Sequence, residues 1–288
     1  MTDNPPPMAI DLQGERWRQW ILDNLQRNCS PAEMLKRMAS GAWDREKAAQ
    51  ALDEGLTLLG IPRDWRKPLP AIKQSASVTN GDGQPVRVLS RFEKPHAVLL
   101  DQLLSAEECK ALIDYAYSKG LRKSGVVDSG TGQSIEHHAR TSTSVFFTRA
   151  ETSLIDMLET RLANLTGWPV ENGEGLQMLQ YEPGQEYKAH YDWFNPENPG
   201  SALHLQRGGQ RVGTTVVYLA IPEEGGGTRF PGSGIEVYPN AGGAIFFTDM
   251  DVSGEPDMTS LHAGTPVIKG TKIIVTYWQR EGAFRVKE

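Results

Sequence analysis

The chain has 288 residues, of which 39% are hydrophobic and 23% charged, so it is long enough to bury a core without disulfides. Thirty basic residues against 36 acidic ones give a formal net charge of -6, which argues against a general nucleic-acid partner, since such proteins carry a basic excess. Two cysteines, Cys29 and Cys109, short apolar runs and an N-terminus without a signal-peptide pattern together predict a cytoplasmic protein with no membrane partner.

The first part of the chain is predicted to be helical. Apolar residues recur at helical spacing from Trp17 to Leu25, and a second helix is expected after Ser30, whose spacing to Glu33 predicts a capping box. A third helix is expected from Asp44. Proline and glycine residues over 62–85 predict a linker. We therefore place a helical module and linker at residues 1–75, and expect it to serve as a structural or interaction module or in recognition of a protein substrate.

The remainder, residues 76–288, mixes helices and strands. Ser105 and Glu108 predict a second capping box, which opens a helix that buries Cys109, and a further helix is expected at 151–165. Short strands separated by glycine and proline turns are predicted at 96–100, 176–181, 187–193, 213–221, 234–238, 244–249 and 272–279. This pattern favours an α+β fold with a sandwich or jelly-roll core. The sequence has no GxGxxG after a strand and no Walker loop, so a nucleotide-binding α/β fold lacks support.

A metal site is predicted from three side chains. His190 and Asp192 are two residues apart, and such residues point to the same face of a strand. With His262 as a third ligand, two imidazoles and one carboxylate form the facial triad of non-haem Fe(II) oxygenases. Lys272 opens a neighbouring strand. Burial of its ammonium group is costly without an anion, so it is a candidate for the distal carboxylate of 2-oxoglutarate.

Several motifs carry a family resemblance that extends over residues 96–280. They are His190-Tyr191-Asp192 with the preceding Gln180-Tyr181-x-x-Gly184-Gln185-x-Tyr187, His262-Ala-Gly-x-Pro-Val with Lys272, Glu224-Gly-Gly-Gly-Thr-x-Phe-Pro, and Arg140-Thr-Ser. Together they resemble the prolyl 4-hydroxylase family of Fe(II)- and 2-oxoglutarate-dependent dioxygenases.

The resemblance implies a double-stranded β-helix, a jelly roll at about 174–280 with flanking helices. It also implies Fe(II) held by His190, Asp192 and His262, with 2-oxoglutarate and O2 as co-substrates and L-ascorbate as reductant. Lys272 completes the catalytic set. The implied reaction hydroxylates a C–H bond, here expected in a prolyl residue of a protein or peptide, and releases succinate and CO2.

Five further residues receive predicted roles, each with ordinary packing as its alternative. Tyr181 and Thr214 are expected to contact 2-oxoglutarate beside Lys272, and Trp278, on the same strand face as Lys272, is expected to line the pocket. Arg140 and Tyr187 are expected to contact the substrate.

Two alternative functions stay open at this point. The same triad also serves hydroxylases of free amino acids or other small molecules, and a jelly roll can be a non-catalytic binding or sensor domain. The intact triad and Lys272 argue against the sensor. The glycine- and serine-rich segment 124–138, interpreted as a lid, favours a polypeptide substrate, whereas the polar insertion at 195–211 departs from the family pattern.

Overall fold

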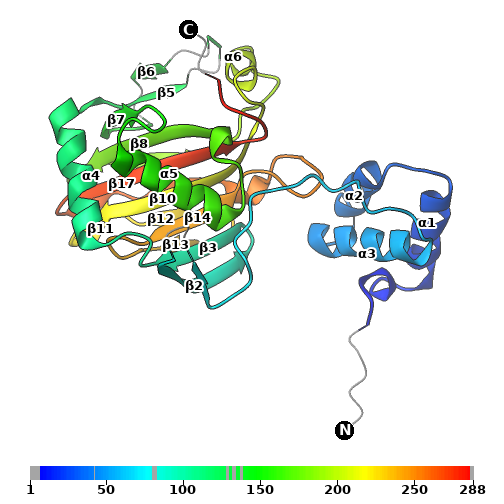
Figure 1. Ribbon diagram of the computed structural model, residues 1–288. Helices are drawn as coiled ribbons and strands as arrows, with labels where there is room; N and C mark the ends of the chain where they lie inside the picture. The colour runs from blue at the N-terminus through cyan, green and yellow to red at the C-terminus, as the bar shows by residue number, and fades with distance from the viewer. Residues whose placement is uncertain are drawn as a thin grey trace. The chain divides into compact units, whose positions relative to one another are not determined.

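The chain divides into two compact units in a computed structural model, which describes residues 7–41, 43–79, 83–127, 130–131, 134–136 and 139–285 (Figure 1). The first, the helical unit, comprises Met1–Pro68 and Asp251–Glu255; the second, the strand-rich unit, comprises Leu69–Met250 and Pro256–Glu288. The division falls between Pro68 and Leu69, where the sequence suggested a boundary near residue 75. In the segment interpreted as a lid, residues 128–129, 132–133 and 137–138 lie outside the described residues.

The described part of the helical unit contains three helices. They are α1 (Glu15–Gln26), α2 (Pro31–Ala39) and α3 (Arg45–Leu58), preceded by a 3-10 turn, η1 (Ala9–Asp11). Asp44 caps α3 by accepting hydrogen bonds from the amides of Glu46 and Lys47. The capping box predicted at Ser30 does not form, because the carboxylate of Glu33 turns instead to Lys36, 3.3 Å away.

The segment Asp251–Glu255 belongs to the helical unit through both polar and apolar contacts. Arg45 binds the carboxylate of Asp251, and its Nη2 donates to Ser253 Oγ at 2.9 Å. The amide of Lys67 donates to the carbonyl of Val252 at 2.8 Å, and the Val252 side chain packs against the helical core. A stretch far from the helices in sequence is thus part of their folded unit.

Two antiparallel sheets form the core of the strand-rich unit. The larger sheet has the order β1-β2-β3-β14-β10-β17-β8-β7-β4, and the smaller has the order β13-β12-β15-β9. The larger sheet consists of β1 (Ser77–Thr79), β2 (Pro85–Glu93), β3 (His96–Asp101), β14 (Ala244–Thr248), β10 (Arg211–Ala220), β17 (Lys272–Arg280), β8 (Gly173–Tyr181), β7 (Thr143–Phe147) and β4 (Arg122–Lys123). The smaller consists of β13 (Ile235–Val237), β12 (Thr228–Phe230), β15 (His262–Gly264) and β9 (Tyr187–His190). Two antiparallel sheets of this kind fit the predicted jelly-roll core.

Two short pairs and several helices complete this unit. The pairs are β11 (Glu224–Gly225) with β16 (Val267–Lys269) and β5 (Gly125–Val127) with β6 (Ser134–Glu136). The helices are α4 (Ala106–Lys119), α5 (Ser153–Thr166), α6 (Ser201–Leu205) and the 3-10 turns η2 (Val170–Asn172) and η3 (Met258–Ser260). The helix α6 lies within the insertion predicted at 195–211. In the described part of the chain, no helix is both long and apolar enough to cross a bilayer.

The helices α4 and α5 cover one face of the large sheet (Figure 1), sharing a core with Leu176, Met178 and Val275. The predicted capping box at Ser105 forms: Ser105 Oγ accepts from the Glu108 amide, and the Glu108 carboxylate accepts from the Ser105 amide. The other face of the sheet meets the smaller sheet, and a second apolar cluster fills the space between them. The site described next lies on this side.

Candidate metal centre

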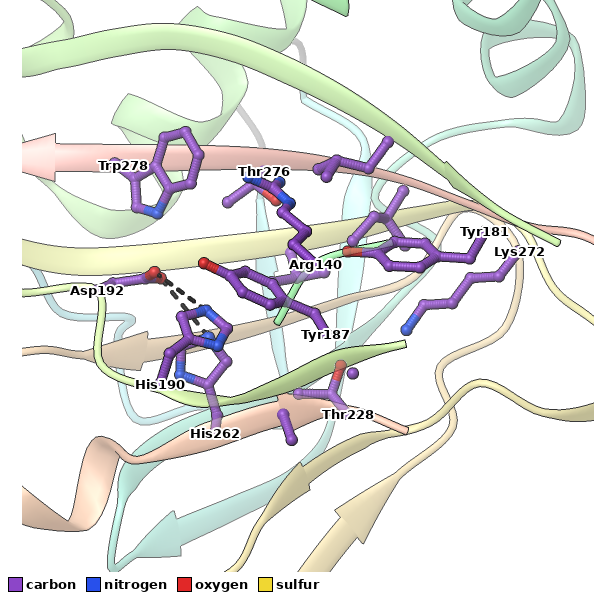
Figure 2. A pocket seen from close by; sticks show the side chains of 15 residues that line it. Arg140, Tyr181, Tyr187, His190, Asp192, Thr228, His262, Lys272, Thr276 and Trp278 are labelled. Carbon is purple, nitrogen blue, oxygen red and sulfur yellow. Dashed lines mark ion pairs between the residues drawn. The ribbon is translucent and has the colours of Figure 1, made fainter. Parts of the chain in front are cut away.

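Three potential metal ligands converge between the two sheets. Ligand atoms of His190, Asp192 and His262 all lie within 4.8 Å of one another. The histidines come from neighbouring strands, since His190 ends β9 and pairs directly with His262 at the start of β15. Figure 2 shows both imidazoles directed at the carboxylate, with Nε2 of His190 3.6 Å from Asp192 Oδ1 and Nε2 of His262 3.7 Å from Oδ2.

Backbone carbonyls orient both imidazoles. Nδ1 of His190 lies 2.8 Å from the carbonyl of Lys188, and Nδ1 of His262 lies 3.0 Å from that of Ser260. A carbonyl only accepts, so each Nδ1 carries a hydrogen and each Nε2 faces Asp192. Burial and the neighbouring His190 lower the pKa of His262 to about 4. His262 is therefore neutral at pH 7, as a metal ligand must be.

Asp192 joins the site in a different way from the one predicted. The strand β9 ends at His190, so Asp192 lies in the turn that follows, and shared strand facing does not bring the two side chains together. Burial by itself would raise the pKa of Asp192, but His262, His190 and Arg211 outweigh it and hold the pKa below its ordinary value. The result is an anionic oxygen between two imidazole nitrogens, a donor set that fits Fe(II) with open positions for other ligands.

A pocket extends from the triad to a buried lysine. Lys272 opens β17 opposite Tyr181 of β8 and is only 2% exposed. Its Nζ donates to the carbonyl of Gly227 at 3.4 Å and lies 5.0 Å from the ring centre of Tyr218. Burial lowers the pKa of Lys272 to about 7. Among the described residues no carboxylate forms an ion pair with it, so the pocket is suited to an anion that enters from outside.

Four of the five residues with predicted binding roles line this pocket: Tyr181, Tyr187, Arg140 and Trp278. The ring of Tyr187 stacks on that of His190 with centres 3.6 Å apart, and the guanidinium of Arg140 lies 4.8 Å from the Tyr187 ring centre. Burial raises the pKa of Tyr187 to about 12, so its hydroxyl stays protonated. Their contacts with ligands stay predictions.

Thr214 is the fifth, and it lies at a different place from the other four. Its hydroxyl lies 2.9 Å from Asp192 Oδ2 and 2.9 Å from Asp249 Oδ2, and the side chain is not among the described residues that line the pocket. The strand explains the difference. Thr214 pairs with Trp278 at the triad end of β10, whereas Tyr218, further along β10, pairs with Ile274 near Lys272. Thr228 lines the pocket instead and shares a 2.5 Å hydrogen bond with the hydroxyl of Tyr218.

Two residues beside the triad escaped the sequence analysis. Arg211 donates to Glu174 at 2.5 Å, lies 4.1 Å from the ring centre of Trp278, and brings Nη1 to 4.0 Å from Asp192 Oδ1. Asp249 is fully buried, and burial followed by the charge of Asp192 raises its pKa well above the ordinary value. In the sequence, each of the two is a charged residue at one end of an apolar strand. A charged residue that is buried at such a position requires a partner.

Known proteins are similar to this chain in sequence. The 2OG-Fe(II) oxygenase superfamily profile matches residues 176–280. A probable prolyl 4-hydroxylase 3 of Arabidopsis thaliana is 38% identical over 212 residues, which cover 67% of this chain and 72% of that protein. The chain belongs to the prolyl 4-hydroxylase family.

Two further similar proteins are also named as prolyl hydroxylases. Prolyl 4-hydroxylase 1 of Arabidopsis thaliana is 39% identical over 204 residues, covering 66% of this chain and 70% of that protein. A solved viral collagen prolyl hydroxylase from Paramecium bursaria Chlorella virus-1, a 2-oxoglutarate complex, is 31% identical, with a TM-score of 0.49 and coverage of 63% of this chain and 94% of that one.

Membership of the prolyl 4-hydroxylase family makes the chain a 2-oxoglutarate-dependent dioxygenase that uses Fe(II). The non-catalytic binding or sensor alternative is thereby set aside.

The buried lysine leads to a pH-dependent prediction for 2-oxoglutarate. A carboxylate partner raises the pKa of Lys272 from the value of about 7 that burial gives it, so binding takes up a proton when the pH exceeds 7. Raising the pH from 6 to 8 should therefore weaken 2-oxoglutarate binding about 10-fold. Anaerobic calorimetry on the Mn(II)-loaded protein, in two buffers of different ionisation enthalpy, measures both the affinity and the proton uptake. Constant affinity without proton uptake would contradict this assignment.

Proposed function

We propose that the enzyme hydroxylates a prolyl residue of a protein or peptide and converts 2-oxoglutarate to succinate and CO2. In this proposal His190, Asp192 and His262 hold the iron, and Lys272 binds the distal carboxylate of 2-oxoglutarate. The names of the relatives support the prolyl substrate. The burial of Lys272, with which no carboxylate of the described residues forms an ion pair, supports the co-substrate site. L-ascorbate as reductant and a cytoplasmic location are part of the proposal.

The side chains of the pocket divide the work. Bound iron, together with 2-oxoglutarate and O2, supplies the oxidising power for an unactivated C–H bond. The imidazoles of His190 and His262 offer nitrogen lone pairs, and Asp192 offsets part of the metal charge. Tyr181, whose ring centre lies 5.6 Å from Lys272 Nζ, and Thr228 line the same pocket and would assist at the distal carboxylate. Apolar walls of Leu179, Val216 and Ile274 exclude water.

The observation that carries the choice of a polypeptide is the charge of the pocket lining. Of the described residues that line the pocket, Asp192 alone is acidic, and it belongs to the metal. The ammonium group of free proline would therefore be buried without a partner, which is costly. A prolyl residue within a chain has a neutral amide at this position. Arg140, which also donates to Gln177 Oε1 at 3.1 Å, and Tyr187 are proposed to contact the backbone of the substrate.

The charge argument predicts that a proline-containing peptide is used with a kcat/KM at least about 10-fold higher than that of free proline. Succinate release and product mass measure the reaction. N-acetylproline amide serves as a control, because it removes both charges of free proline and adds two amide groups but no neighbouring residue. It should resemble the peptide more than free proline. Efficient turnover of free proline with no reaction of any peptide would instead establish a small-molecule hydroxylase.

Residues 1–75 are proposed to form a structural or interaction module that lies outside the chemistry. The described side chains of the helical unit contribute nothing to the pocket lining or to the metal cluster. The cysteine usage fits a reducing compartment, since Cys29 and Cys109 are both free thiols.

A further inference from the structure

The hydroxyl of Thr214 connects two buried carboxylates. Thr214 Oγ1 lies 2.9 Å from Asp192 Oδ2 and 2.9 Å from Asp249 Oδ2, both hydrogen-bond distances. Thr214 and Asp249 are each 0% exposed, and Asp192 is 6% exposed. Water therefore does not compete for these contacts, and the three side chains must satisfy one another.

The number of hydrogens decides which group donates. A hydroxyl has one hydrogen and can donate to only one of two carboxylates, so the other carboxylate must itself carry a hydrogen. The guanidinium of Arg211 lies 4.0 Å from Asp192 Oδ1, and a metal held by Asp192 and the two Nε2 atoms would favour the anion of Asp192. Asp249 Oδ1 has no hydrogen-bond partner among the described residues. A fully buried carboxylate with an unpaired oxygen is better accommodated in the neutral form.

We propose that Thr214 and Asp249 are positioning residues for the metal carboxylate. The neutral acid of Asp249 donates to Thr214 Oγ1, which fixes the rotation of the hydroxyl, and Thr214 in turn donates to Asp192 Oδ2. This chain of hydrogen bonds holds the Asp192 carboxylate at a fixed angle to the two imidazoles. The inference rests on the proposed metal site and assigns Thr214 to the metal rather than to 2-oxoglutarate.

The neighbouring residue Thr215 provides a matched control on the same strand. It is also 0% exposed, it lies on the opposite face of β10, and its hydroxyl has no hydrogen-bond partner in the described part of the chain. Thr214→Val and Thr215→Val remove the same hydroxyl with the same change of shape. Only the first removes a hydrogen bond to the metal carboxylate.

The experiment is a titration of the full chain with Mn(II). Binding is monitored by calorimetry and by the electron paramagnetic resonance signal of free Mn(II). Thr214→Val should weaken Mn(II) binding about 10- to 100-fold, as loss of a hydrogen bond to a metal ligand does. Thr214→Ser should restore affinity, and Thr215→Val should bind as the wild type does. With saturating metal, the KM for 2-oxoglutarate of Thr214→Val should stay within about twofold, because the hydroxyl does not reach that site. Thr214→Ala carries the same expectations if Thr214→Val does not fold.

The neutral state of Asp249 is tested by Asp249→Asn. An amide keeps a donor toward Thr214 and adds no charge, so Mn(II) affinity should stay within about threefold of the wild type. An affinity at least about 10-fold weaker would mean that Asp249 is an anion, and would overturn its assignment.

Thr214→Val and His262→Ala together distinguish an error in the positioning role from an error in the metal site. Wild-type Mn(II) affinity in Thr214→Val, together with a raised KM for 2-oxoglutarate, would overturn the positioning role and return Thr214 to the co-substrate. If His262→Ala has lost Mn(II) in the same series, the metal site stands despite that result. Undiminished Mn(II) binding in folded His262→Ala would refute the metal site itself.

Discussion

His262→Ala is expected to lose its iron and its turnover of 2-oxoglutarate. The substitution leaves two protein ligands of the three and removes the nitrogen that lies 3.7 Å from Asp192 Oδ2. Because loss of a mere partner of a metal ligand already costs 10- to 100-fold in affinity, loss of the ligand itself should cost at least about 100-fold. Metal analysis after anaerobic reconstitution measures the iron, and succinate release measures the reaction.

A second histidine serves as the control for His262. His204 of α6 stacks on Phe194 with ring centres 4.9 Å apart and is not part of the metal cluster, so His204→Ala should retain iron. Asp192→Asn should also be damaging, since it removes the one anionic ligand while preserving shape. Stoichiometric iron in folded His262→Ala would rule out the proposed ligand set.

The sequence predicted the jelly-roll core and the convergence of His190, Asp192 and His262 because chemistry and pattern agree there. Fe(II) favours nitrogen and carboxylate donors, and the spacing of His190 and Asp192 indicated one such pair, to which His262 was added as the third ligand. The local reason given for Asp192 was nevertheless wrong in detail. Strand β9 ends at His190, and the position where a strand ends depends on partners that the local pattern does not contain.

The two predicted capping boxes also show that local spacing alone does not decide the structure. Ser105 with Glu108 and Ser30 with Glu33 have identical spacing, yet only the first pair forms. Glu108 also receives hydrogen bonds at 2.7 and 2.8 Å from Arg161 of α5, which holds its carboxylate near the helix start. Among the described residues, the carboxylate of Glu33 forms an ion pair with Lys36, an exposed neighbour on the same helix. Tertiary contacts decide between equivalent local signals.

The polar groups around the metal were harder to foresee than the ligands. Thr214 lies on the expected strand and on the same face as the pocket residue Val216, but its hydroxyl contacts Asp192 and is not among the described groups that line the pocket. Arg211 opens β10 and Asp249 directly follows β14, so their relation to Asp192 exists only after these two strands have paired. No spacing in the sequence encodes such a contact.

Lys272→Met is expected to raise the KM for 2-oxoglutarate about 10- to 150-fold, which corresponds to the 1.5–3 kcal/mol of a charge-assisted contact. Methionine retains the apolar stem and removes the ammonium, so the pocket stays filled while the distal carboxylate loses its partner. The increase should be largest at pH 6, where Lys272, with a pKa of about 7, is charged in the wild type. Initial rates against 2-oxoglutarate concentration at pH 6 and pH 8 give both values.

The controls for Lys272 separate a lost contact from a damaged fold. Lys269→Met alters an exposed lysine of β16 that pairs with Glu223, and its KM should stay unchanged. Mn(II) affinity of Lys272→Met should remain within about threefold of the wild type, because Lys272 makes no contact with the triad. In the wild type, 2-oxoglutarate should raise the melting temperature by binding only the folded state, and in Lys272→Met this shift should largely disappear at the same concentration. An unchanged KM together with an unchanged thermal shift would exclude Lys272 from the co-substrate site, since a buried ammonium within reach of the carboxylate cannot be removed without cost.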